Sequence, residues 1–173
     1  AASRNSSDQA LTLLAARTLI ISNRFEDALL LLNNIDANRT TSSAYWELKG
    51  TALFSVKQTE EALTHYKKWV SYFPKQESPT IALLTVLGTQ YEYAEAAAVA
   101  ANFRAESENL QIKLMHAYFL VMSKDIKGAK AVLASLDSQY QIVPVVRGIK
   151  ARIALLERRG ALGIEDARIS FMA

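Results

Sequence analysis

The chain has 173 residues, of which half are hydrophobic, a formal net charge of +3 at pH 7 and no cysteine. This length allows one domain with a substantial buried core, and the absence of cysteine excludes disulfides, thiolate metal sites and thiol nucleophiles. Every apolar run is shorter than the roughly 18–20 residues that cross a bilayer, so we predict no membrane span. Glycine and proline are few, while alanine and leucine are abundant, which favours an all-α protein.

The first elements in chain order are two predicted helices separated by a short turn. We expect residues 1–7 to be loose and the first helix to begin at Ser7-Asp8, because Ser and Asp are good N-caps. Asn23 marks the turn, and Ala28 lies in the second helix. Together these elements form a helical hairpin.

The second hairpin is the clearest in the sequence. Ser43 can cap its first helix, Lys57 lies in the turn, Thr59 begins the second helix and Pro74 ends it. This hairpin also carries a small residue, Gly50, in its first helix. Small residues let two helices approach closely, since a larger side chain would push their axes apart.

The third and fourth hairpins follow with weaker signals. Ser78-Pro79 is suited to start a helix, because Pro is favoured at the first helical position. The turn of the third hairpin is predicted near Tyr91. The fourth hairpin is predicted to start near Ser107 and to turn at Lys124.

A fifth, less regular pair is predicted at the end of the chain. Pro144 lies near its start, and Gly160 is predicted to end its first helix as a C-terminal cap. The chain then closes on large apolar residues, Phe171 and Met172. We expect a following helix to cover them if the sequence is a segment of a longer protein.

The hairpins share a fixed period. Equivalent alanines recur at intervals of 34, 34 and 33 residues, at Ala28, Ala62, Ala96 and Ala129. A period of about 34 residues in a helical sequence is typical of a stacked helix-turn-helix array. Such an array buries its apolar faces only between neighbouring units, so several units are needed for stability.

The second hairpin carries the side chains that make this pattern specific. Large and small residues alternate at set spacings in both helices, at Trp46, Gly50, Leu53, Ala62, Tyr66 and Pro74. This pattern resembles the tetratricopeptide repeat family, and the chain looks like a bacterial protein of that family or a segment of one. Trp69 departs from it, because a small residue is usual there.

The resemblance implies an all-α fold, an α-α superhelix of about five stacked antiparallel helix pairs. It covers a single repeat domain at residues 8–173. The expected units are 8–40, 43–75, 78–106, 107–138 and 141–173.

Residues that could support catalysis are sparse. His65 is expected to face outward or to lie at a unit boundary, and His116 is expected to be packed or hydrogen-bonded; neither has a metal-ligating partner at helical spacing. The carboxylate pairs recur in the first turns of second helices, where the helix dipole favours them. There is no phosphate-binding glycine loop. We therefore predict a non-enzymatic protein without cofactor, metal site or small-molecule substrate.

The basic residues are interleaved with acidic ones over most of the length, which argues against nucleic acid as a partner. The exception is the stretch from Gln141 to Gly160, where five basic residues stand against Glu157 alone. Three interpretations remain open for this stretch: a solvated helix face with cations near a helix C-terminus, a patch for an acidic partner, or a nucleic-acid surface.

The remaining candidate is a binding groove. In the superhelix that the resemblance implies, the first helix of each pair lines the concave side, and a mostly apolar groove of this kind suits an amphipathic or extended peptide. For each residue the alternative is a place in the core beneath the second helices. The candidate groove residues are Leu13, Arg17, Ile20, Ile21, Glu47, Thr51, Phe54, Ile81, Thr85, Leu114, Tyr118 and Val121.

These observations predict a protein–protein interaction module that acts as an adaptor or assembly scaffold and binds another protein or peptide. Two alternatives share the fold: a secretion or assembly chaperone for one client, and a structural spacer that self-associates through its C-terminal end. The partner cannot be deduced from the sequence, and both the cytoplasm and the periplasm remain open as the compartment.

Overall fold

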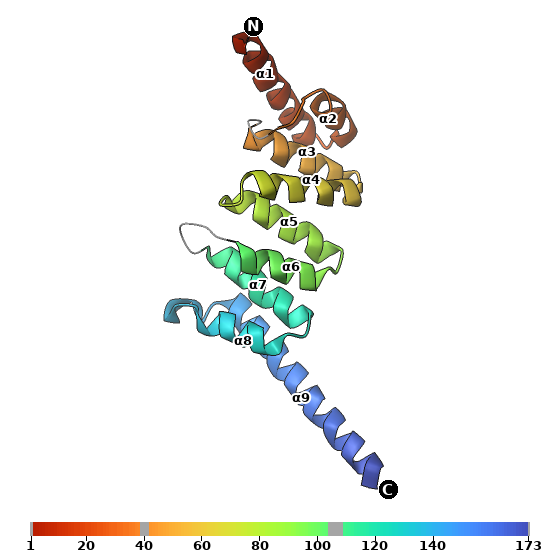
Figure 1. Cartoon of the computed structure of the whole chain (residues 1–173), viewed down its shortest axis with the longest axis vertical. Coiled ribbons are helices and arrows are strands. Elements are labelled where there is room, and N and C mark those ends of the chain that lie inside the picture. The colour runs from red at the N-terminus through yellow and green to blue at the C-terminus, as the bar shows by residue number, and fades with distance from the viewer. Residues whose placement is uncertain (1, 39–41, 104–108, 173) are drawn as a thin grey trace. The chain divides into compact units, whose positions relative to one another are not determined.

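The computed structural model describes residues 2–38, 42–103 and 109–172, and side chains within 8–38, 42–103 and 109–161. Within these ranges all regular elements are helical, which confirms the all-α class (Figure 1). Contacts divide the chain into two compact units: unit 1 holds helices α1 to α5, and unit 2 holds α6 to α9. The single repeat domain at residues 8–173 stays a prediction.

Unit 1 consists of two helix hairpins followed by the first helix of a third. Each of its helices contacts the next one along the chain, and α1 also contacts α3. The first helices of the two hairpins are therefore neighbours. The helices are α1 (Ala2–Ile21), α2 (Phe25–Leu32), α3 (Ser43–Ser55), α4 (Thr59–Tyr72) and α5 (Glu77–Thr89).

Three predicted helix starts in unit 1 need correction. The prediction of a loose segment at residues 1–7 is wrong for residues 2–7, because α1 already begins at Ala2; no Pro or Gly interrupts the sequence before Asp8. The N-caps of α3 and α5 are Ser42 and Gln76, one and two residues before the predicted ones. Pro79 consequently lies in the first turn of α5, where the missing N–H removes no helical hydrogen bond.

The turns of the hairpins repeat in conformation as well as in position. Asn23, Lys57, Tyr91 and Lys124 all have a positive φ, between 57° and 70°, and each precedes a repeat alanine by five residues. After α3, the N–H of Lys57 donates to Phe54 O and the N–H of Gln58 to Leu53 O. This pair of bonds is a Schellman motif, and it satisfies carbonyls at the helix end. The same two bonds follow α1 and α7.

Small residues at the repeat positions are fully buried, as predicted. Ala28 and Ala62 have no exposed surface in unit 1, and Ala96 and Ala129 have none in unit 2. The core of the α3–α4 hairpin is aromatic, and its Trp46 and Trp69 are both 1% exposed. Trp69, which departs from the repeat pattern, is therefore an interior residue.

Unit 2 is built around α7, which contacts α6, α8 and α9. Side chains cap two of its helices: Asn109 accepts a hydrogen bond from the N–H of Ile112, and Asp125 accepts one from the N–H of Gly128. The elements are α6 (Tyr93–Asn102), α7 (Leu110–Met122), α8 (Ile126–Ala134), the 3-10 turn η1 (Ser138–Tyr140) and α9 (Pro144–Met172).

The predicted fifth helix pair is wrong. Residues from Pro144 to Met172 form one continuous helix, and Gly160 lies inside it instead of ending it. A single glycine costs a helix only about 1 kcal/mol relative to alanine, and no proline follows to stop the helix. The predicted start of the fourth pair at Ser107 lies outside the described residues.

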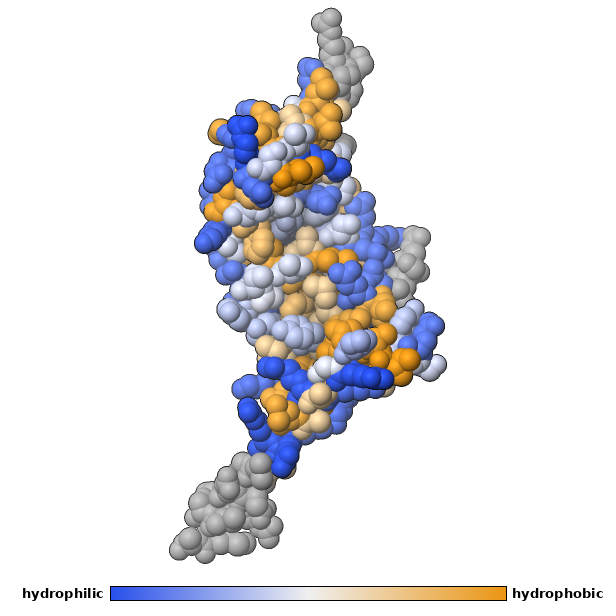
Figure 2. Space-filling view, turned by 180° about the vertical axis from the view of Figure 1, so that it is seen from behind, coloured by the Kyte–Doolittle hydropathy of each residue, from blue (hydrophilic) through white to orange (hydrophobic). Residues whose placement is uncertain are grey.

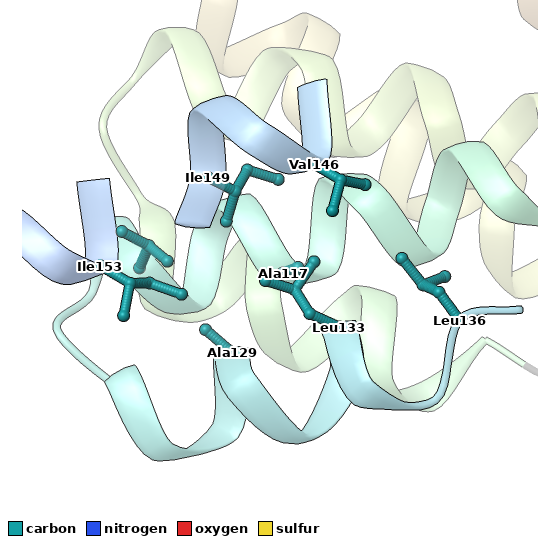
Figure 3. Packing of buried hydrophobic residues seen from close by; sticks show 8 residues of the cluster. Ala117, Ala129, Leu133, Leu136, Val146, Ile149 and Ile153 are labelled. Atoms are coloured by element: carbon teal, nitrogen blue, oxygen red, sulfur yellow. The ribbon is translucent and has the colours of Figure 1, made fainter. Parts of the chain in front are cut away.

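The core of unit 2 joins three helices. Figure 3 shows apolar side chains from α7, α8 and α9 converging on one another. On α9 the buried residues are Val146, Ile149 and Ile153, a spacing of three and four that places them along one face of the helix. The other members of this cluster are Ala117, Val121, Ala129, Leu133 and Leu136.

Candidate protein-binding surface

The predicted groove residues occupy equivalent positions on successive first helices. Each position recurs at intervals of 34, 34 and 33 residues through α1, α3, α5 and α7. Ile21 lies beside the third position. The first position holds Leu13, Glu47, Ile81 and Leu114, the second Arg17, Thr51, Thr85 and Tyr118, and the third Ile20, Phe54, Gly88 and Val121.

The second position is the most accessible of the three. Arg17 and Thr85 are exposed, Tyr118 is 42% exposed, and Thr51 is half-buried. The first and third positions are half-buried apart from Glu47, which is exposed, and Val121. In unit 1 the first-helix residues therefore combine apolar side chains with hydroxyls and single charges, most of them at least partly accessible.

Val121 is the exception and requires a correction. It is only 2% exposed and belongs to the core that joins α7, α8 and α9. Leu114 packs against the same core but remains partly accessible. Because α9 covers part of α7, the end of α7 in unit 2 is interior, and Val121 is removed from the candidate surface.

In unit 1 the contact between α1 and α3 brings the first helices of two hairpins together. Their surface residues differ in charge: Arg17 on α1 is exposed, and so is Glu47 on α3. Apolar area flanks these charges, from half-buried Ile20 and Phe54 and from Ile21, which is 76% exposed.

The α3 part of this surface connects to the interior through Tyr66 on α4. Burial raises the pKa of the Tyr66 phenol, a hydrogen bond with the Thr51 side chain opposes this shift, and the charge of Glu47 adds to it. Two of the predicted surface residues thus lie close to the hydroxyl of a buried aromatic residue. Thr51 is consequently held in place by the hairpin core.

The prediction for His65 requires a correction. It does not face outward but is half-buried, and its ring stacks on that of Trp46 at a centroid distance of 4.8 Å. Trp46 lies on α3 of the same hairpin, so this contact is within a predicted unit and not at a boundary between units. The Nε2 atom of His65 lies 2.8 Å from the carbonyl oxygen of Trp46, which can only accept, so Nε2 carries the donated proton. Burial lowers the pKa of His65 to about 4, although this hydrogen bond acts to raise it.

His116, on α7, is half-buried as predicted. Burial lowers the pKa of His116 below the ordinary value, and the negative charge of Asp125 partly offsets this. Over the part of the chain that the structure describes, no three His, Cys, Asp or Glu side chains cluster closely enough to hold a metal ion. Both histidines are therefore placed as parts of the packed hairpins.

Sequence reasoning missed one feature, a cavity of about 440 Å³ between α8 and α9 in unit 2. Its lining combines the small residues Ala134 and Ala154 with two lysines. The sequence contains one signal for it, the excess of basic residues from Gln141 to Gly160. One interpretation of that excess is a patch for an acidic partner.

Hydrophobic and hydrophilic side chains are intermixed on the face seen in Figure 2. Within the described ranges, no helix combines the length and the apolar character that crossing a membrane requires.

No protein-family model and no curated protein sequence matches the chain. Among solved structures, that of PilF from Pseudomonas aeruginosa, a protein with tetratricopeptide repeats, matches with a TM-score of 0.59 and 17% sequence identity. The match covers 83% of this chain and 66% of the PilF chain, so this chain spans just under two thirds of that one. At this identity the likeness concerns the fold, and it supports the helical-repeat architecture of the tetratricopeptide type.

Proposed function

We propose that this chain is a non-catalytic protein-interaction module, an adaptor or assembly scaffold that binds a segment of another protein along its first helices. The observation that supports the proposal most directly is a difference in burial between two repeat positions, one on the second helices and one on the first helices. In unit 1 the repeat alanines on the second helices are fully buried, whereas the repeat position of Arg17, Thr51 and Thr85 on the first helices is exposed or half-buried. A regular row of accessible side chains at one repeat interval matches a ligand that is itself extended or helical.

The composition of this surface indicates the kind of segment. Apolar side chains such as Ile20 and Phe54 favour a ligand with apolar anchors, while Arg17 and Glu47 favour polar groups of opposite sign between them. Aromatic and arginine side chains often dominate binding energy. We therefore expect Arg17 and Phe54 to contribute most, and an affinity in the micromolar range, about −8 kcal/mol.

The test is affinity capture from the native host, followed by mass spectrometry and by titration of the captured partner. Arg17→Glu and Phe54→Ala should each weaken binding, because they remove a charge and an apolar anchor from the first helices. Matched controls on second helices are Lys127→Glu on α8 and Leu30→Ala on α2, where Leu30 is 67% exposed. Equal capture by all four variants would disprove the proposed surface.

A further inference from the structure

The cavity between α8 and α9 lies outside the first-helix surface and has an apolar floor. Leu133 and Ala134 line it from α8, and Ile153 and Ala154 line it from α9. Leu133 and Ile153 belong to the core that Figure 3 shows, so the cavity opens directly onto packed apolar side chains. Because alanines form part of its lining, space remains between the helices that larger side chains would fill.

One wall of the cavity is held by Gln141. Its Nε2 donates to the carbonyl oxygens of Leu133 and Leu136, at 2.8 and 3.0 Å, and its Oε1 accepts from Lys150 Nζ at 2.7 Å. Gln141 therefore connects the end of α8 to the first half of α9. A site that is preorganised in this way does not have to order itself when a ligand binds.

The opposite rim is charged and open. Lys130 and Glu157 form an ion pair at 2.5 Å, with side chains 54% and 48% exposed. An ion pair this exposed contributes little to stability, so an incoming carboxylate can compete for Lys130. With Lys150, the rim presents two ammonium groups above an apolar floor.

Two lysines and one glutamate line the cavity, and the two helices that border it carry a larger positive excess. From Ile126 to Ala134 and from Pro144 to Ala161, the sequence contains seven basic residues and a single acidic one, Glu157. This excess attracts anionic partners and disfavours cationic ones.

From these observations we propose that the cavity binds an acidic peptide segment of a partner protein. A large apolar side chain of that segment, such as Leu or Phe, enters between Ala134 and Ala154. A neighbouring carboxylate accepts hydrogen bonds from Lys130 and Lys150. This site is separate from the first-helix surface, so a partner could engage either one without the other.

The experiment uses the full chain and three synthetic heptapeptide libraries with Leu or Phe at the centre. The flanking positions are Asp or Glu in the first library, Asn or Gln in the second and Lys in the third. We expect the acidic library to bind about tenfold more tightly than the amide library, and the gap to shrink as salt is added. In a methyl-labelled sample the acidic peptides should shift the Ile153 methyl signals and leave those of Ile81 in place.

Variants separate this site from the rest of the protein. Ala154→Trp fills the cavity and Lys150→Glu reverses a rim charge, so each should reduce binding of the acidic library about tenfold. Arg159→Glu is the matched control, because nine residues beyond Lys150 place it on the opposite side of α9. Phe54→Ala, which tests the first-helix surface, should leave this binding unchanged.

Three results would overturn the proposal. They are equal binding of the acidic and amide libraries, unchanged binding by both Ala154→Trp and Lys150→Glu, and shifts at Ile81 without shifts at Ile153. Circular dichroism of each variant verifies that the helices remain, so that lost binding is not lost folding. A failure here would leave the first-helix proposal intact, because the two sites share no residue.

Discussion

The ring of Tyr66 on α4 lies so close to Gly50 on α3 that no other side chain fits between them. A Cβ atom added at Gly50 would lie 2.2 Å from Cε1 of Tyr66 and 2.4 Å from its Cζ. Both residues are buried, with Tyr66 only 5% exposed. The close approach of the two helices in this hairpin therefore depends on the missing side chain of Gly50, as the sequence pattern predicted.

Gly50→Ala is expected to destabilise the protein. Displacing the confined ring of Tyr66 costs about 1–3 kcal/mol, and the better helix propensity of alanine returns up to about 1 kcal/mol. The net loss should be roughly 1–2 kcal/mol in the free energy of unfolding, measured by urea denaturation with circular dichroism.

Gly148→Ala on α9 is the matched control for this substitution. Nothing lies within 4 Å of a Cβ added there, so alanine should stabilise the helix by about 0.5–1 kcal/mol. In a Tyr66→Leu background the cost of Gly50→Ala should largely disappear, because the ring is gone. An equal cost in both backgrounds would show that the Tyr66 ring is not the cause.

His65 is expected to make stability dependent on pH below neutrality. Its pKa is about 4 in the folded protein and 6.5 in the unfolded chain, so the unfolded state binds a proton that the folded state resists. The stabilisation is complete above pH 6.5 and is lost as the pH falls from 6.5 to 4, by roughly 2–3 kcal/mol. The measurement is the free energy of unfolding across this range.

His65→Leu should flatten this dependence, because leucine does not titrate. His116, whose pKa is also lowered by burial, will leave a smaller residual slope. A direct NMR titration of the His65 ring checks the cause. An ordinary pKa near 6.5, or an unchanged slope in His65→Leu, would contradict this prediction.

Glycine at the turn positions is expected to stabilise the hairpins. Lys57 and Lys124 have φ values of 63° and 70°, in the left-handed region that costs a side-chain-bearing residue about 1–2 kcal/mol. Glycine removes most of this cost but loses more backbone entropy on folding, so we expect each Lys→Gly change to add about 0.5–1 kcal/mol. The measurement is the shift of the denaturation midpoint.

Lys127→Gly provides the comparison for the turn variants. Lys127 is the second residue of α8, where the backbone is helical and not left-handed, so glycine relieves no strain there and costs part of the roughly 1 kcal/mol that it costs in a helix interior. Replacing lysine by glycine should therefore raise the free energy of unfolding at position 124 and lower it at position 127. If Lys124→Gly destabilises the protein as Lys127→Gly does, then the left-handed turn is not strained.

The sequence predicted the features that repeat and missed those that occur once. The turns at Asn23, Lys57, Tyr91 and Lys124 were predictable, since each follows a helix at the same distance before a repeat alanine. Repetition averages over weak local signals, so an ambiguous register in one hairpin could be resolved from its neighbours.

The prediction that Gly160 ends a helix was wrong because it depended on this one glycine alone. A glycine is common both after a helix and, at a modest cost, within one, and no repeat partner distinguishes the two cases. The prediction of Val121 as a surface residue was wrong for another reason. Val121 occupies the helix position equivalent to that of Phe54, but in unit 2 α9 packs over it. Which neighbour covers a position is decided by tertiary packing.

The cavity at α8 and α9 and the burial of His65 could not be deduced from spacing alone. The cavity requires that Ala134 and Ala154, twenty residues apart, line the same space. The stacking of His65 on Trp46 requires the exact rotation of α4 against α3. The candidate surface was predicted as a row of helix positions, and its use by a partner remains a proposal.

Amide hydrogen exchange with and without the captured partner tests the central claim most directly, because it locates the binding surface without any substitution. We predict that the partner slows exchange in α1, α3 and α5, around Arg17, Thr51 and Thr85, and leaves the second helices α2 and α4 almost unchanged. Protection confined to the second helices, or absent from all the first helices at a saturating partner concentration, would contradict the proposed function.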